Sequence, residues 1–206
     1  MSADSAAVGA FLAAADSYPE SVAGQTPWPY CLLDWTPSAD APEPVRRVLA
    51  VVHDNVDWLR AVIAARGWPG RSLVGEDGVD ACWLLLQHAG SGVPTIGTPA
   101  NLSFQASCVP LLHAAVQCGE AHPRHLAHVV DNQRARTNQP PEYAVLATAF
   151  TTIDDELVLR RPLDADQIDA SRAAIGLLPL SVDLARRRAG DPPDATHGTR
   201  PEPWPA

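Results

Sequence analysis

The residues of this sequence best suited to acid–base chemistry stand at the end of one apolar segment. Within residues 80–89, an apolar run over residues 81–86 is followed by the polar pair Gln87 and His88. A helix that is apolar all round is a buried helix, so this pair is expected at the edge of the core. Because an unpaired buried polar group costs about 1–3 kcal/mol, Gln87 and His88 need partners. Those partners are either structural groups or a ligand.

Further polar side chains lie at the start of, or beside, the apolar faces of neighbouring predicted secondary-structure elements. The candidate site collects six such residues: Asn55, Gln87, His88, Gln105, Asp131 and Tyr143. This set suffices for metal-free acid–base chemistry, with His88 as proton shuttle, Asp131 as its partner and Tyr143 as a donor. Five residues are expected to bind the substrate: Asn55, Gln87, Gln105, Trp83 and Arg134. The same groups can instead form a satisfied polar network that locks helix packing.

Three histidines at a spacing of three residues are the best candidates for metal binding: His122, His125 and His128. Two of them would lie on neighbouring helical turns, and a third ligand such as Glu120 or Asp131 would be needed. The sequence has no HExxH motif, so we expect a solvated helix flank here and no metal. It also lacks a P-loop, a GxGxxG motif and a GxSxG elbow, so we expect no cofactor.

The composition is that of an acidic globular protein. The net charge of −9 lacks the basic footprint of a nucleic-acid-binding protein and argues against binding to anionic membranes. No apolar run approaches the roughly 20 residues of a membrane span, and the first residues lack the basic region of a signal peptide. We therefore expect a cytoplasmic protein with a small-molecule substrate and with neither a nucleic-acid nor a membrane partner. The oligomeric state is left open.

The elements that must position these residues are predicted to be helices. Apolar residues repeat at helical spacing over residues 44–66, and the Gly67-Trp68-Pro69-Gly70 stretch ends that helix. A turn at residues 75–78 leads into the central apolar helix. Residues 90–103 are expected to form a loop, followed by helices over residues 104–118 and 123–137. Pro110 either kinks the first of these helices or marks its start.

The sequence period changes after residue 142. Residues 143–152 and 156–161 are short β-favouring runs, which predict a hairpin at about 143–161, and short helices follow near 164–174 and 179–188. The chain is thus predicted to be mostly α, a single-domain bundle of about six helices with a small β-hairpin near the C-terminus. Residues 1–44 would form an N-terminal helix and a Pro/Trp-rich extended segment. Residues 45–188 would form the helical core domain, and residues 189–206 a disordered tail.

A string of short motifs runs along residues 48–185. Its members are Asn55 with Leu59, Gly67-Trp68-Pro69, Val74-Gly75, Trp83-Leu84-Leu85-Leu86-Gln87-His88-Ala89, Phe104-Gln105, Gly119-Glu120-Ala121, Leu126-Ala127 with Asp131, and Asp169 with Arg172, Gly176-Leu177 and Pro179-Leu180. This order resembles an uncharacterised, mainly actinobacterial domain-of-unknown-function family. The resemblance implies that the six candidate residues belong to one site.

Two stretches depart from the pattern of that family. Gly90 stands where the family has aspartate, and Pro141-Glu142-Tyr143-Ala144-Val145-Leu146 replaces Gln-x-Tyr-Gly-Thr-Gln. Compared with the family pattern, this chain therefore lacks one carboxylic acid, two side-chain amides and one hydroxyl at these positions. The chain has either lost the activity of the family or reshaped its pocket for a more apolar ligand.

These observations predict a small cytoplasmic enzyme that acts on a small organic metabolite, in specialised metabolism, by metal-free acid–base catalysis. The alternative is a non-catalytic binding or immunity-type interaction module on the same scaffold. An enzyme should place His88 and Asp131 within hydrogen-bond reach beside a solvent-connected cavity. An interaction module should fill that cavity and expose an apolar patch, for example around Trp28 and Trp35.

Overall fold

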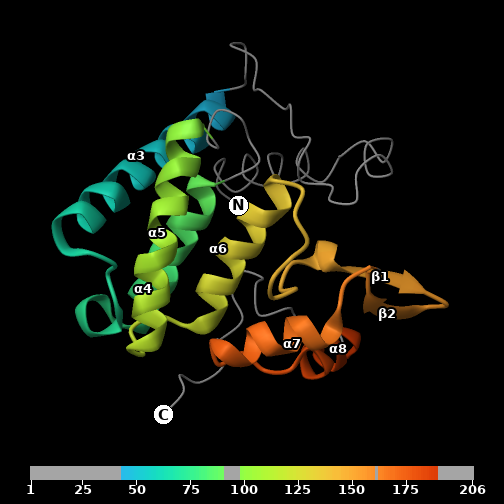
Figure 1. Cartoon of the computed structure of the whole chain (residues 1–206). Helices are drawn as coiled ribbons and strands as arrows, with labels where there is room; N and C mark the ends of the chain where they lie inside the picture. The colour runs from blue at the N-terminus through green and yellow to red at the C-terminus, as the bar shows by residue number, and fades with distance from the viewer. Residues whose placement is uncertain (1–42, 91–97, 161, 190–206) are drawn as a thin grey trace.

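The computed structural model describes residues 43–90, 98–160 and 162–189 (Figure 1). This part of the chain contains α3 (Glu43–Arg66), α4 (Arg71–Ala89), α5 (Pro99–Gln117), α6 (Pro123–Arg136), α7 (Ala165–Ala174) and α8 (Leu180–Arg188), and a hairpin of β1 (Phe150–Ile153) and β2 (Glu156–Leu159). The predicted mostly α domain of about six helices with a small hairpin is confirmed. The predicted N-terminal segment and C-terminal tail lie outside the described residues, apart from the few that border the core.

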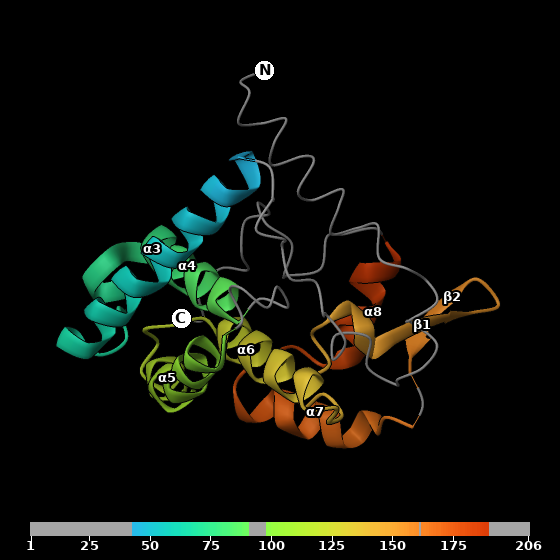
Figure 2. The ribbon, with the colours of Figure 1, turned by 90° about the horizontal axis from the view of Figure 1, so that it is seen from above.

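The helices form two groups around α6. In both views α3, α4 and α5 lie on one side of α6, while α7, α8 and the hairpin lie on the other (Figures 1 and 2). Helix α4 is central to the first group because it packs against α3, α5 and α6. The main core fills this group, and its fully buried side chains include Leu59, Val79, Leu86, Leu112 and Leu126.

Helix α4 contains the turn that the glycines at residues 75–78 predict. Gly75 has φ 74° and ψ 174°, so the segment is one short turn followed by a second, longer helix. Glycine adopts this left-handed φ without a steric penalty, which explains the break at this residue. The longer part then turns Val79, Cys82, Trp83 and Leu86 toward the core.

Helix α5 begins earlier than predicted. Pro99 occupies the first turn, and the Thr98 hydroxyl accepts a hydrogen bond from the backbone N–H of Asn101 at 3.2 Å. A threonine cap followed by proline is a strong start signal, so the predicted loop over residues 99–103 is wrong. The helix continues through Pro110, which lies on the exposed face. A helix start at Pro110 is therefore also wrong.

The hairpin is shorter than predicted. Strand β1 pairs antiparallel with β2 from Phe150 opposite Leu159 to Ile153 opposite Glu156. The two turn residues, Asp154 and Asp155, both have positive φ, as the tight turns that suit the twist of a hairpin require. Residues 143–146 are a loop, and Ala147–Ala149 form a 3-10 turn, so the predicted strand start at residue 143 is wrong.

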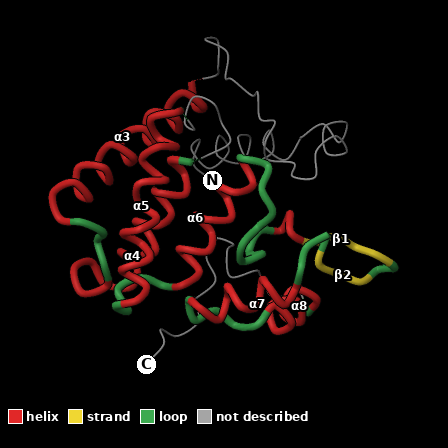
Figure 3. The backbone as a smooth tube through the Cα atoms, viewed as in Figure 1, coloured by secondary structure: helices red, strands yellow, loops and turns green. Residues whose placement is uncertain are grey.

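A second, smaller core holds the hairpin and the last two helices together. Asp164 caps α7 by accepting hydrogen bonds from two backbone N–H groups of its first turn. Ile168 of α7 and Leu180 of α8 then pack with Ala149 and Phe150. This packing fixes the end of the long connection that runs from α6 to β1, drawn mainly as loop in Figure 3.

Candidate functional site

Asp131 fastens the loop that follows α6. Its carboxylate is fully buried, and Oδ1 accepts the backbone N–H of Glu142 at 2.8 Å and of Tyr143 at 3.0 Å, while Oδ2 accepts that of Val145 at 2.9 Å. Burial raises the pKa of this carboxyl, and the three amide donors oppose the rise. The structure thus gives both oxygens a structural role. Pairing of Asp131 with His88 stays a prediction.

Two arginines hold the carbonyl groups of the same loop. Arg172 Nη1 of α7 donates to the Tyr143 carbonyl at 2.8 Å, and Arg187 Nη2 of α8 donates to the Val145 carbonyl at 2.8 Å. Between them, the buried Ala144 has φ 51°, a conformation that costs an L-residue about 1–2 kcal/mol. Such strain persists only where the surroundings over-determine the backbone, so three helices together fix this loop.

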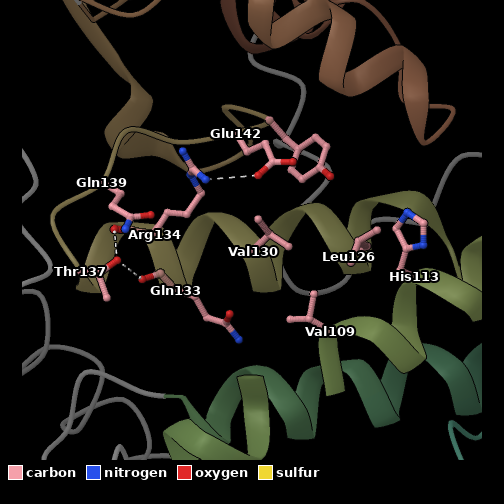
Figure 4. Close-up of a pocket in the computed structure, with 10 residues that line it drawn as sticks. Val109, His113, Leu126, Val130, Gln133, Arg134, Thr137, Gln139 and Glu142 are labelled. Carbon is pink, nitrogen blue, oxygen red and sulfur yellow. Dashed lines mark hydrogen bonds and ion pairs between the residues drawn. The ribbon is translucent and has the colours of Figure 1, made fainter. Parts of the chain in front are cut away.

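The fixed loop forms one wall of a groove between α5 and α6 (Figure 4), which we call the α5–α6 groove. The groove has a volume of about 490 Å³. Ten residues line it: Val109, His113, Leu126, Val130, Gln133, Arg134, Thr137, Gln139, Glu142 and Tyr143. Apolar side chains from both helices therefore meet polar groups from α6 and the loop, the usual make-up of a small-molecule site.

The loop side of the groove carries an ion pair and a phenol. Arg134 Nη1 lies 3.3 Å from Glu142 Oε2, and Arg134 Nε donates to the Pro140 carbonyl at 2.6 Å. Burial and the neighbouring Glu142 carboxylate raise the pKa of Tyr143. Its hydroxyl therefore stays protonated at neutral pH and can donate a hydrogen bond. The structure brings Tyr143 and Arg134, both predicted site residues, to this one groove.

Gln133 is the groove residue with the clearest need for a partner. Its Nε2 atom is buried and has no hydrogen-bond acceptor among the described residues. In Figure 4 the side chains of Gln133 and Val109 point into the space between α6 and α5. Native proteins leave few buried polar atoms unpaired, so each such atom needs an explanation. A bound molecule that offers an acceptor here would supply one.

A second polar arrangement lies at the end of α4. Gln105 is fully buried, and its Nε2 donates to the Leu86 carbonyl at 2.9 Å. Its Oε1 accepts from Arg136 Nη1 at 3.2 Å. Gly90 lies against this amide, because a Cβ at residue 90 would come within 2.2 Å of Gln105 Nε2. The three helices α4, α5 and α6 therefore meet at Gln105.

The close approach of Gly90 predicts a measurable cost for a methyl group. Gly90→Ala forces the Gln105 amide to shift and is expected to lower the free energy of unfolding by about 1–3 kcal/mol, as measured by urea unfolding. In a Gln105→Ala background the same change should cost much less, because the clash is gone. An equal cost in the two backgrounds would contradict this assignment.

The remaining predicted site residues are spread over three places. Gln87 and His88 are half-buried in the last turn of α4, near Gln105, and Gln87 Oε1 is a buried acceptor without a donor among the described residues. Asn55 is half-buried on α3, and Trp83 is buried on α4. The structure thus groups Gln87, His88 and Gln105 around the end of α4. It places Asp131 and Tyr143 together at the loop.

Three histidines that we expected on a solvated helix flank are buried beside α4: His122, His125 and His128, with 7 %, 0 % and 3 % exposure. His125 Nε2 lies 2.8 Å from Asp80 Oδ1. The His125 ring stacks on Trp83, with ring centroids 4.8 Å apart. Arg124 Nη2 lies 2.9 Å from both oxygens of Asp80. The expectation of a solvated flank is therefore wrong, because α4 covers this face of α6.

Burial keeps these histidines neutral at pH 7. It lowers the pKa of His122 to about 4 and that of His128 to about 3, and it also lowers the pKa of His125. Among the described residues, no three His, Cys, Asp or Glu side chains are placed so that they could hold a metal ion. Asp80 and Arg124 were not predicted. The spacing of Asp80 one turn before Trp83, on the same face of the central helix, was the available signal.

The described residues define a class of protein, a single-domain helical fold with an open groove between two of its helices. None of the described helices is long and apolar enough to cross a membrane. The chain belongs to a family of unknown function (DUF6624), whose model matches residues 36–188. The predicted resemblance to an uncharacterised family is confirmed at this level. No curated protein and no solved structure matches the chain.

Proposed function

We propose that the protein binds a small organic molecule in the α5–α6 groove. The observation that carries this proposal is the buried Nε2 of Gln133, which has no acceptor among the described residues and belongs to a groove wall with the apolar side chains of Val109, Leu126 and Val130. A ligand with an apolar body and a hydrogen-bond acceptor suits both features. Pairing a buried donor that lacks an acceptor recovers about 1–3 kcal/mol, which favours such a ligand over a purely apolar one.

The dimensions and charges of the groove narrow the class of ligand. Its volume of about 490 Å³ lies within the range of roughly 300–1,000 Å³ that is usual for small-molecule sites. The Arg134–Glu142 ion pair on the loop side offers both a donor and an acceptor to a second polar group. The proposed ligand is therefore a metabolite of small to medium size with an apolar body and polar groups at separate positions.

Acid–base catalysis on the bound molecule is the enzymatic part of the proposal. In this proposal the raised pKa of Tyr143 keeps its hydroxyl protonated, so that the hydroxyl can donate a proton or a hydrogen bond to the bound molecule. The Glu142 carboxylate accepts a proton from that molecule. Asp131 acts as a positioning residue, because its carboxylate holds the backbone N–H groups of both. The buried carboxylate of Asp131 lends no support to a dyad with His88. We therefore place the chemistry at the groove rather than at the end of α4.

A thermal-stability screen of metabolites tests the proposal. A ligand at a hundredfold excess over Kd stabilises the folded protein by about 2.7 kcal/mol. Hits should stabilise the wild type but not Val130→Trp, in which an indole fills the groove. Gln117→Leu, a change at an exposed residue of α5 outside the groove, should bind like the wild type.

Two results would count against groove binding. One is a set of hits that stabilise Val130→Trp as much as the wild type, and the other is the absence of any hit in a broad library. The enzymatic part has its own test, in which each hit is incubated with protein and followed by mass spectrometry. Tyr143→Phe should then retain binding and lose turnover. Unchanged turnover in this variant would remove Tyr143 from the reaction.

A further inference from the structure

We propose that Arg136 and Gln105 form a second site, which binds the anionic group of a small molecule through the Arg136 guanidinium. This site lies where the ends of α4 and α6 meet the first turns of α5. Arg136 is not among the residues that line the α5–α6 groove. Gln105 is not among them either, so the two proposed sites share no lining residue.

Arg136 is a half-buried cation that lacks an acidic partner within the described part of the chain. Its described hydrogen bond goes to a neutral amide, from Nη1 to Gln105 Oε1 at 3.2 Å. Burial lowers its pKa to about 10, and no carboxylate of the described residues opposes the shift. The side chain therefore stays charged at neutral pH. Leaving a charge partly desolvated without a counter-charge is costly, so an anion that binds beside Arg136 would be stabilised.

Other buried arginines of this protein show the usual arrangement. Arg124 pairs with Asp80 at 2.9 Å, and Arg187 pairs with Asp183 at 3.2 Å. Each of these pairs satisfies the positive charge from within the fold. The chain carries 24 acidic residues, but the described hydrogen bond of Arg136 goes to the amide of Gln105 and not to a carboxylate.

Gln105 holds the guanidinium in one orientation. The side chain is fully buried, and its Nε2 is already bound to the Leu86 carbonyl at 2.9 Å. Its Oε1 is therefore the atom that faces Arg136, and Gly90 lies close to the same amide. A guanidinium fixed in this way loses little conformational entropy when it binds a ligand.

A second arginine adds positive charge to the same segment of α5. Arg60 of α3 donates from Nη2 to Asn101 Oδ1 at 2.8 Å, and its guanidinium lies 4.4 Å from the centre of the Phe104 ring. Phe104 is the neighbour of Gln105 in sequence. Two arginines with amide partners thus flank the first turns of one helix. The N-terminal end of that helix carries a partial positive charge of its own.

The chemistry of the site selects a small anion. The planar fork of arginine matches a carboxylate or a phosphate, with two parallel N–H donors. The net charge of −9 disfavours a polyanion such as nucleic acid. The predicted ligand is a small molecule that carries one carboxylate or phosphate group.

Isothermal titration calorimetry with acetate, citrate and inorganic phosphate, each against chloride at matched ionic strength, tests the site. At least one of the three anions should bind the wild type saturably. The anion with the highest affinity shows whether the site prefers a carboxylate or a phosphate. Arg136→Gln should weaken that binding at least about tenfold. Arg66→Gln, which removes the same charge from an exposed residue of α3, and Val130→Trp, which fills the groove, should both bind like the wild type.

Three outcomes would overturn the inference. The first is wild-type protein that binds none of the three anions saturably up to high millimolar concentrations, a result that needs no variant. The second is equal affinity in wild type and Arg136→Gln. The third is equal loss of affinity in Arg136→Gln and Arg66→Gln, which would mean that the anions respond to net charge alone.

Discussion

Asp131→Ala is expected to lower the free energy of unfolding by about 3–5 kcal/mol, which is a large part of the stability of a typical domain. The change removes the acceptor of three backbone N–H groups at once, those of Glu142, Tyr143 and Val145. Each buried donor left without an acceptor costs about 1–3 kcal/mol, although partial relaxation of the loop will recover some of this. Urea unfolding followed by circular dichroism measures the effect.

Asp169 provides a matched control, because its carboxylate accepts fewer backbone hydrogen bonds than that of Asp131. Asp169 Oδ1 accepts the backbone N–H of Leu180 at 2.6 Å, and this is a single, part-buried hydrogen bond. Asp169→Ala is therefore expected to cost about 1 kcal/mol. If the two substitutions cost the same, the number of amide groups held by Asp131 does not explain its burial. Asp131→Ala should also abolish ligand binding in the groove, because it releases Glu142 and Tyr143.

Acidification from about pH 7 to pH 4 is expected to destabilise the protein by at least about 3 kcal/mol. In the unfolded chain the buried histidines would protonate near pH 6.5, whereas burial delays protonation of His122 to about pH 4 and of His128 to about pH 3 in the folded state. Between these values the unfolded state binds more protons. Stability is therefore fully present above about pH 6.5 and is lost as the pH falls through this window.

The direction of the effect is reinforced by Asp80. The nearby Arg124 and His125 side chains outweigh the effect of burial and lower the pKa of Asp80, so the stability that it contributes is lost at still lower pH. Urea unfolding at a series of pH values should give a free energy that falls steadily between pH 7 and pH 4. His128→Phe should flatten this slope, whereas His113→Gln, at an exposed residue, should leave it unchanged. A slope that is the same in all three proteins would contradict the assignment to the buried histidines.

Local sequence signals were enough to predict most of the fold. The apolar repeat and the Gly67 stop define α3, Pro123 marks the start of α6, and Asp164 caps α7, which occupies the range predicted for a short helix near 164–174. These signals work because a helix is formed by contacts between residues close in sequence. The start of α5 was within reach of the same reasoning, since Thr98 and Pro99 carry a cap signal.

The candidate site was harder to predict because it depends on contacts between distant segments. The periodicity of α6 places Asp131 at the border of an apolar face, but nothing in that pattern shows that the loop 11 to 14 residues later returns its amide groups to this carboxylate. Similarly, Arg136 in the last turn of α6 has the position of an ordinary surface arginine at a helix C-terminus. Its inward orientation depends on Gln105, a residue of another helix.

The buried histidines show the same limit. A spacing of three residues on α6 fits a solvated flank and a buried face equally well. Trp83 and Asp80 of α4 decide the matter by covering that face. Single-helix periodicity identifies which residues share a face, whereas the partner of that face is set by the packing of the whole domain.

The most direct test of the central proposal is an NMR titration of isotope-labelled protein with the strongest hit of the metabolite screen. We expect the largest chemical-shift changes at the methyl groups of Val109, Leu126 and Val130, together with the side-chain amide of Gln133. Saturable shifts confined to these groups would establish the α5–α6 groove as the binding site. Shifts that spare the Gln133 amide and the three methyl groups, and that gather elsewhere on the molecule, would contradict it.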